Sequence, residues 1–169
     1  MAITIYGASV YQEKGNPSNY RYDVLGDNSE VFTSGDVVTL EAAGTMAVGG
    51  AATTVLGVVP KTQTMASDNE TVAKVHPAYT PADDTIFLMG TNSDLSAAPG
   101  SEGLYYGLTG TTGIQQVDVT SGVTSGASRI VEIVKVDPLN LGGTGAGSGL
   151  RTCLVRFVKT PYTNVTITA

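Results

Sequence analysis

Ser34–Pro60 reads SGDVVTLEAAGTMAVGGAATTVLGVVP and contains two runs rich in β-branched residues, Val37–Leu40 and Val55–Val59. Each run is bounded by Gly, Asp or Pro, and the segment between them is rich in Gly, Ala and Thr. This pattern is typical of short strands joined by tight turns. The apolar spacing of an amphipathic helix does not persist past one turn. The stretch therefore predicts β-sheet.

Apolar runs separated by turn residues continue through the rest of the chain. Further strands are predicted at Thr71–Pro77 and Thr85–Gly90, a hairpin at Leu104–Leu108 with Ile114–Val119, and a final strand pair at Arg129–Val136 with Arg151–Val158. Apolar residues occur at both odd and even positions of Ile130–Val136, which favours a central strand buried on both faces. A spacing of roughly 8–12 residues between turn signals is typical of a sandwich or barrel. We expect a single all-β domain.

The composition excludes several classes of protein. The chain has 169 residues with 21 Gly and 14% charged residues, which is typical of a turn-rich β protein of one domain. Its single Cys and single His exclude an internal disulfide and a zinc cluster within the chain. A net charge of −6, with nine scattered basic residues, argues against a nucleic-acid-binding surface.

The sequence also bears on where the protein acts. Met1–Tyr6 lacks the basic start and apolar core of a secretory signal, and no run approaches the ~18 apolar residues of a membrane span. We therefore expect a soluble protein made in a cytoplasm, with no membrane partner.

The sequence contains two features that could be taken for a reactive or binding site, a glycine-rich segment and a single Cys with a single His. Gly142–Gly149 invites a phosphate-loop interpretation, but Leu150 and Arg151 follow where the motif requires Lys and Ser or Thr. A flexible turn between the last two strands is the simpler interpretation. Cys153 lies in an apolar strand pattern and His76 precedes a proline, so a Cys–His nucleophile pair is disfavoured against a buried structural cysteine.

Acidic residues offer no better case for a site. Asp68–Glu70 and Asp83–Asp84 lack the spacing of a calcium loop, and acidic residues are common in turns for local hydrogen-bonding reasons. Carboxylate pairs for glycoside hydrolysis cannot be read from spacing, but a chain without Trp is poorly equipped to stack sugars. We predict no catalytic residue, no metal site, no cofactor and no enzymatic activity.

Several segments resemble, in order, the capsid decoration (cement) proteins of tailed bacteriophages. The first is Gly35-Asp36-Val37-Val38-Thr39-Leu40 followed by Leu56-Gly57-Val58-Val59, which is similar to the family's "G-D-x-V" strand, short hairpin and "hydrophobic-G-V" strand. A strand, a Pro-bearing corner and a second strand follow at Thr71–Gly90, and the final pair includes Val136-Asp137-Pro138. The resemblance covers about residues 31–158.

The resemblance implies a fold, a function and partners. The fold would be a compact β-sandwich or β-barrel (β-tulip-like) decoration domain over residues 31–169, with long Gly/Ser/Thr-rich loops. Residues 1–30, the least regular part of the sequence, are predicted as an extended N-terminal arm and edge segment, and this is where the chain departs most from the family. The function would be that of a virion structural protein on the outer capsid surface, made in the host cytoplasm. It would stabilise the shell by bridging subunits of the major capsid protein, as a homotrimer or other homo-oligomer.

Candidate contacts between subunits follow from this expectation. They are the tyrosines around the N-terminal segment and polar or glycine residues of the loops Thr91–Gly103 and Gly142–Gly149: Tyr6, Tyr11, Tyr20, Tyr22, Asn92, Asp94, Gly145 and Gly147. Tyr combines apolar contact with a hydrogen-bonding tip, which suits an interface. It also suits a half-buried position at the edge of a sheet, so packing of the tyrosines on the chain's own sheet is an alternative.

Two other functions remain open at the level of sequence. One is a receptor- or carbohydrate-binding β module of a phage fibre or spike, although the chain shows no repeat or stalk. The other is a small hydrolase of unrecognised type, which the missing nucleophile and base disfavour.

Overall fold

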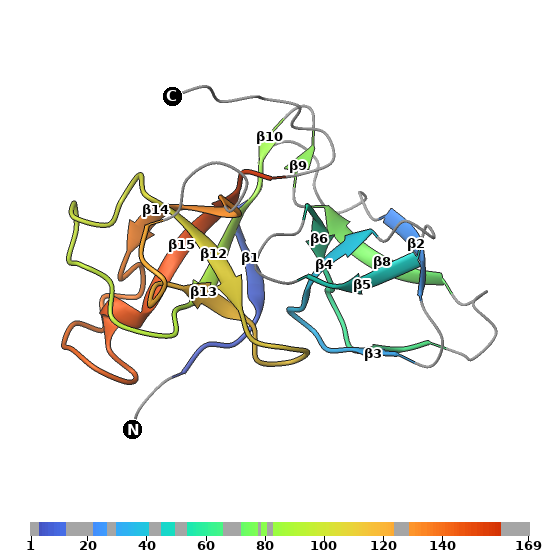
Figure 1. Ribbon diagram of the computed structural model, residues 1–169, viewed down its shortest axis with the longest axis horizontal. Coiled ribbons are helices and arrows are strands. Elements are labelled where there is room, and N and C mark those ends of the chain that lie inside the picture. Colours follow the sequence, from blue (N-terminus) through green and yellow to red (C-terminus); the bar gives the residue numbers. More distant parts are fainter. Residues whose placement is uncertain are drawn as a thin grey trace.

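The computed structural model describes residues 4–12, 22–26, 30–40, 45–49, 54–65, 72–77, 79–80, 83–123 and 129–159. Among these residues there are β-strands, one 3-10 turn and no α-helix (Figure 1). The predicted all-β class is therefore confirmed. The strands form two lobes that lie side by side, which we call the sheet lobe and the ring lobe.

The sheet lobe is a six-stranded antiparallel sheet with the order β1-β11-β15-β14-β12-β13. Its strands are β1 (Ala8–Gln12), β11 (Ile86–Gly90), β12 (Tyr105–Thr109), β13 (Gln116–Asp118), β14 (Val131–Val136) and β15 (Thr152–Phe157). The sheet curls, because β13 returns to the end of β11 through a bridge between Thr91 and Val117 and a 3.1 Å hydrogen bond from Asn92 N to Val117 O. The predicted hairpin β12–β13 and the final pair β14–β15 are both confirmed.

The ring lobe is barrel-like, since each of its five strands pairs with two others in the order β2-β5-β4-β6-β8 and β8 pairs with β2. The strands are β2 (Tyr22–Gly26), β4 (Val37–Leu40), β5 (Thr45–Val48), β6 (Val55–Val58) and β8 (Val72–Pro77). The stretch Ser34–Pro60 thus supplies β4, β5 and β6. Short strands complete the fold: β3 (Val31–Phe32) with β7 (Gln63–Thr64), and β9 (Tyr79–Thr80) with β10 (Asp83–Asp84).

Strands β4 and β6 contribute side chains to the cores of both lobes. Val37, Val55 and Val58 belong to the hydrophobic cluster of the sheet lobe, whereas Val38 and Leu56 belong to that of the ring lobe. Val37 and Val38 are successive residues of β4, so they point to opposite faces. In β6, the pairing with β4 passes from Gly57 to Val55, so Leu56 is an extra residue in a bulge, and strict alternation does not hold there. Because burying one such side chain contributes roughly 1.5–3 kcal/mol, separating the lobes would be costly.

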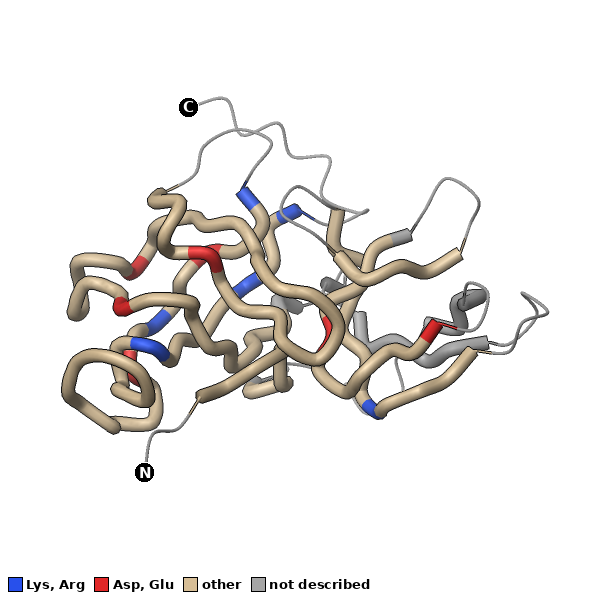
Figure 2. Tube along the Cα trace, turned by 60° about the horizontal axis from the view of Figure 1, so that its bottom comes forward, with Lys and Arg blue, Asp and Glu red and all other residues tan. Residues whose placement is uncertain are grey.

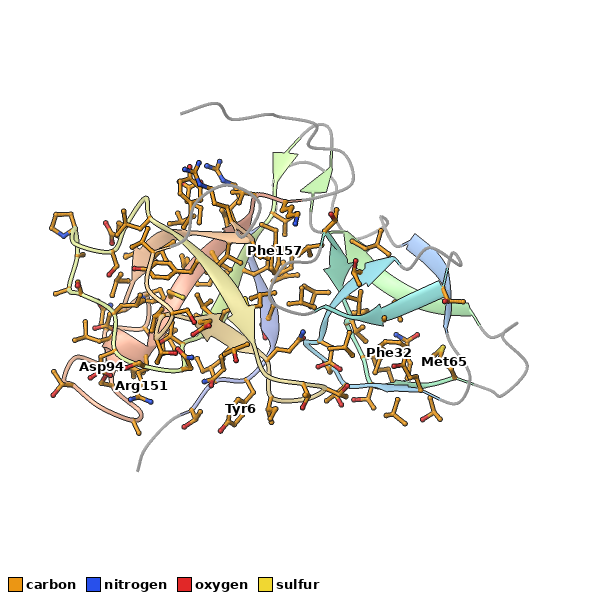
Figure 3. All side chains as sticks on the ribbon, viewed as in Figure 1. Tyr6, Phe32, Met65, Asp94, Arg151 and Phe157 are labelled. Carbon is orange, nitrogen blue, oxygen red and sulfur yellow. The ribbon has the colours of Figure 1, made fainter. Side chains whose placement is uncertain are left out.

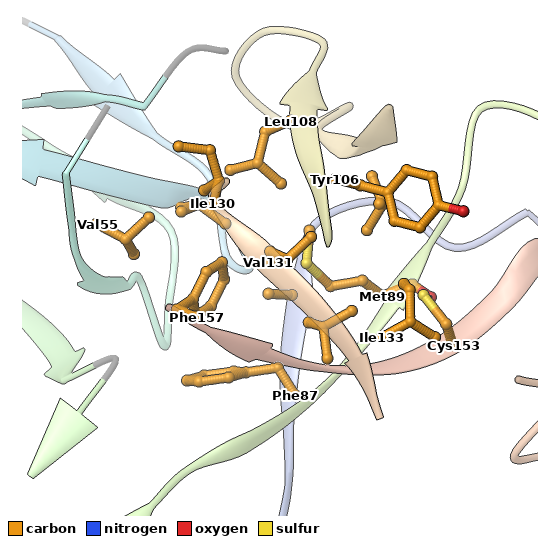
Figure 4. Packing of buried hydrophobic residues seen from close by; sticks show 14 of the residues in the cluster. Val55, Phe87, Met89, Tyr106, Leu108, Ile130, Val131, Ile133, Cys153 and Phe157 are labelled. Atoms are coloured by element: carbon orange, nitrogen blue, oxygen red, sulfur yellow. The ribbon is translucent and has the colours of Figure 1, made fainter. Parts of the chain in front are cut away.

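The core of the sheet lobe is packed around two phenylalanines (Figure 4). The rings of Phe87 and Phe157 meet edge to face, with centroids 5.0 Å apart and planes inclined by 60°, an arrangement that aromatic rings favour. Ile133 and Cys153, from β14 and β15, are fully buried in the same cluster.

The expectation that β14 is buried on both faces is wrong. Val134 is 41% exposed and Lys135 is also exposed, while Val131 and Ile133 are buried. Ile133 pairs with Val155 and Lys135 with Leu154, so Val134 is an extra residue in a bulge. A bulge interrupts the strict alternation of faces. Apolar residues at both odd and even positions of β14 therefore do not mean that both faces of the strand are buried.

The stretch 1–30, predicted as an N-terminal arm and edge segment, supplies one strand to each lobe. β1 is the edge strand of the sheet lobe and pairs with β11, while β2 lies in the ring lobe between β5 and β8. Hydrogen bonds from Gly7 N to Gln115 O (2.8 Å) and from Ala8 N to Gly35 O (2.7 Å) place the start of β1 where the two lobes meet.

Candidate contact surface

The N-terminal tyrosines that the structure describes are accessible. Tyr6, just before β1, is 52% exposed, and Tyr11, within β1, is 51% exposed. Val10 between them in the same edge strand is also exposed. Of Tyr22 only the backbone in β2 is described, and Tyr20 lies outside the described residues. The edge of the sheet lobe therefore presents two half-exposed phenol rings.

The loops Thr91–Gly103 and Gly142–Gly149 are fastened to each other, and we call them the loop pair. The Asp94 carboxylate accepts a hydrogen bond from Gly145 N through Oδ2 (2.7 Å) and one from Arg151 Nε through Oδ1 (2.9 Å). Leu95 N donates to Leu150 O (2.8 Å). Asp94 and Arg151 lie together at the end of the sheet lobe far from the ring (Figure 3). Two candidates predicted separately, Asp94 and Gly145, are thus brought into direct contact.

The electrostatics of this contact favour an ionised Asp94. The hydrogen bond from Arg151 and that from the Gly145 amide lower the pKa of the Asp94 carboxyl below its ordinary value. Each charged side chain of the pair remains about one-third exposed. The Asp94 carboxylate is therefore used to hold the two loops together, and sequence reasoning missed its partner Arg151.

Asp137 organises the loop that follows β14. Its carboxylate accepts hydrogen bonds from Leu141 N (2.7 Å) and Gly142 N (3.0 Å), and its carbonyl accepts one from Asn140 N (3.1 Å). Gly149 packs against this carboxylate so closely that a Cβ at position 149 would overlap it. The turn predicted between the last strands is therefore a hydrogen-bonded loop that depends on at least one of its glycines.

Asn92, another predicted contact residue, is occupied within the molecule. Its Nδ2 donates to Asp118 Oδ1 (2.8 Å) and Thr120 Oγ1 (3.0 Å), and its Oδ1 accepts from Val119 N (2.9 Å). Burial acts to raise the pKa of Asp118, but hydrogen bonds from Ser121, Thr120 and Asn92 outweigh it and lower that pKa to about 2. Asn92 therefore ties the start of the first loop to the end of β13.

Sequence reasoning missed two exposed leucines beside the loop pair. Leu139 is 42% exposed and Leu141 is 38% exposed, in the connection between β14 and β15. Gly147, a predicted candidate, lies further along the same connection, with a positive φ of 85°. The signal was present in the sequence as two leucines in a segment otherwise made of turn residues.

The structure offers no support for a nucleophile at Cys153. The thiol is fully buried and donates to Met89 O at 3.6 Å, and burial raises its pKa. His76 lies in β8 of the ring lobe, in a different sheet. Asp83 and Asp84 form β10, whereas Asp68–Glu70 lie outside the described residues. In the described part of the chain, no group of three or more potential metal ligands occurs, and no helix there is long and apolar enough to cross a membrane.

Comparison of the sequence with models of known protein families and with curated proteins finds no match. The geometry of the surface is therefore the basis for interpreting it. Two loops held in fixed positions, and exposed tyrosines along one sheet edge, are suited to contact with another macromolecule.

Proposed function

We propose that this protein is a non-enzymatic structural protein of a phage virion, which binds the outer surface of the capsid and stabilises it by bridging subunits of the major capsid protein. The observation that carries the proposal is that the Asp94 carboxylate, in the first loop of the loop pair, binds Gly145 N of the second loop and the side chain of Arg151. The ordered resemblance of the strand segments to decoration proteins supplies the class of partner.

A fastened loop pair suits docking because less conformational entropy is lost when it binds. Ordering a flexible loop at an interface costs free energy that reduces affinity. Here Asp94 and Asp137 already hold backbone N–H groups of the loop after β14. Val37, Val55 and Val58 from strands of the ring lobe pack into the core of the sheet lobe, so the body behind the loops is also well packed.

The distribution of charge supports the outer face of a shell over the DNA-facing inner face. The net charge is −6, and basic residues are scattered among acidic ones along the described chain (Figure 2). Binding to phosphates requires clustered Lys and Arg that release counterions. The proposed location is therefore the virion exterior, with no nucleic-acid or membrane partner.

Stabilisation of the shell would follow from mass action. A protein that binds only the assembled lattice shifts the equilibrium toward that lattice. A homotrimer or other homo-oligomer would engage several shell subunits at once, and linked contacts gain strength through effective concentration. Neither a cofactor nor a bond-breaking step is needed for this role.

The test uses particles produced without this protein, to which the purified chain is added. We expect the chain to sediment with the particles and to raise the temperature at which they release their genome. Bovine serum albumin at the same concentration is the control. Absence of co-sedimentation would contradict the proposal, and binding to host cells or to their surface sugars instead would favour a receptor-binding module.

A further inference from the structure

We propose that Leu139 and Leu141, which we call the leucine tip, insert into an apolar pocket of a protein partner. The identity of that partner as the major capsid protein rests on the proposed function. The tip adjoins the loop pair, in the connection that leads from β14 to β15 at the left of Figure 1.

The backbone that carries the tip is held in place by hydrogen bonds. Asp137 accepts the N–H of Leu141 through its carboxylate (2.7 Å) and the N–H of Asn140 through its carbonyl (3.1 Å). Gly149 N donates to Gly142 O (2.7 Å), which closes the base of the loop beyond the tip. Both leucines are displayed from a defined loop, with 42% and 38% of their surface exposed.

The segment that carries the tip contains no charged residue. Pro138–Leu150 contains no Asp, Glu, Lys or Arg, and this loop is drawn without charged residues in Figure 2. The flanking carboxylates of Asp137 and Asp94 are occupied by backbone N–H groups and by Arg151. The tip therefore presents leucine side chains from a segment whose other residues are uncharged.

An uncharged segment with two exposed leucines fits an apolar pocket of a protein better than it fits nucleic acid or a membrane surface. Interface cores are depleted in charged residues, as this loop is. Nucleic acid would require Lys or Arg. Surface binding to membranes usually combines apolar side chains with Lys or Arg and aromatic anchors, and anionic lipids repel an acidic chain. The tip has neither basic nor aromatic residues.

The experiment compares two double variants with the unaltered protein in binding to particles that lack it. L139S/L141S removes the tip, whereas I114S/V123S changes two other exposed apolar residues (51% and 56% exposed) and is the matched control. Burying two leucine side chains contributes enough free energy that we expect L139S/L141S to weaken binding by about tenfold or more. The control should weaken binding by no more than about twofold. Thermal unfolding of all three proteins should be unchanged.

Each other outcome overturns a distinct statement. If the unaltered protein binds and L139S/L141S binds equally well, the leucine tip is not the docking element although the proposed function stands. If the unaltered protein does not bind particles, the proposed function fails and the assignment of the partner fails with it. Leucine-dependent binding to neutral phosphatidylcholine vesicles, or leucine-dependent self-association with particle binding retained, would show that a membrane or a second copy occupies the tip.

Discussion

The side chain of Gln115 is hydrogen-bonded to both backbone groups of Val37, 78 residues away in the sequence. Val37 N donates to Gln115 Oε1 (2.6 Å), and Gln115 Nε2 donates to Val37 O (3.2 Å) and to Gly49 O (2.6 Å). Gln115 is fully buried. One amide from the sheet lobe thus binds the start of β4 and the residue that follows β5 in the ring lobe.

Replacing Gln115 by Leu should destabilise the whole fold. The substitution leaves Val37 N and Gly49 O without this partner in a buried place, whereas Val37 O keeps its hydrogen bond from Gly49 N. Each unpaired buried group costs about 1–3 kcal/mol. We expect a loss of roughly 2–4 kcal/mol in the free energy of unfolding, measured by urea denaturation. Thr112→Ala, at the exposed turn of the same hairpin, is the control. A change for Gln115→Leu as small as that of the control would show that the amide does not join the lobes.

Asp118 should make stability depend on pH in the acid range. Its pKa is lowered from 3.8 to about 2 in the folded protein, so its contribution is present above pH 3.8 and is lost as the pH falls toward 2. After discounting for solvent screening, we expect Asp118→Asn to cost on the order of 1 kcal/mol at pH 7. The difference between the two proteins should shrink between about pH 5 and pH 2. A difference that stays constant over this range would contradict ionisation as its cause.

Asp94 should control the order of the loop pair without controlling the fold. Asp94→Ala removes the acceptor for Gly145 N and the partner of Arg151, so the Gly145 amide should exchange with deuterium faster. Amides of the central strands β14 and β15 should exchange as before, because their ladder is untouched. Thr111→Ala, in the distant hairpin, serves as control. Unchanged exchange at Gly145 would show that the loop holds its position by other means.

Cys153 should be inert in the native protein. Its thiol is fully buried and its pKa is raised by burial, and the thiolate is the reactive form. We expect negligible reaction with Ellman's reagent at pH 8 and release of one equivalent of thiol in guanidinium chloride, as the chain has one Cys. Rapid reaction under native conditions would reopen the possibility of a cysteine nucleophile.

Local sequence patterns predicted most of the longer strands, but not β1 (Ala8–Gln12) and β2 (Tyr22–Gly26), which lie in the segment predicted as an arm. The runs at Val37–Leu40 and Val55–Val58 became β4 and β6, and the pair β14–β15 occupies the middle of the sheet lobe. The pattern failed at Val134, because a bulge adds a residue on the outer face without changing the apolar run that precedes it. Strand propensity and turn chemistry are local, so they can be read from neighbouring residues.

The arrangement of the candidate surface could not be predicted in the same way. The loops containing Asp94 and Gly145 were both expected to make contacts, but their mutual fastening through Arg151 depends on residues 51 and 57 positions apart. The pairing of Gln115 with Val37 spans a still longer separation. Such contacts arise from how β11, β13 and β15 assemble, which a single sequence does not specify. Leu139 and Leu141 could have been noticed as apolar residues within a turn-rich segment.

The most direct test of the proposed function is the amount of this protein in purified virions. Virus particles purified from the source on a density gradient would be analysed for this chain relative to the major capsid protein by quantitative mass spectrometry. We predict a fixed ratio of the same order as the capsid protein itself. A handful of copies per particle would indicate a fibre or vertex component, and absence from the particles would contradict the proposed function.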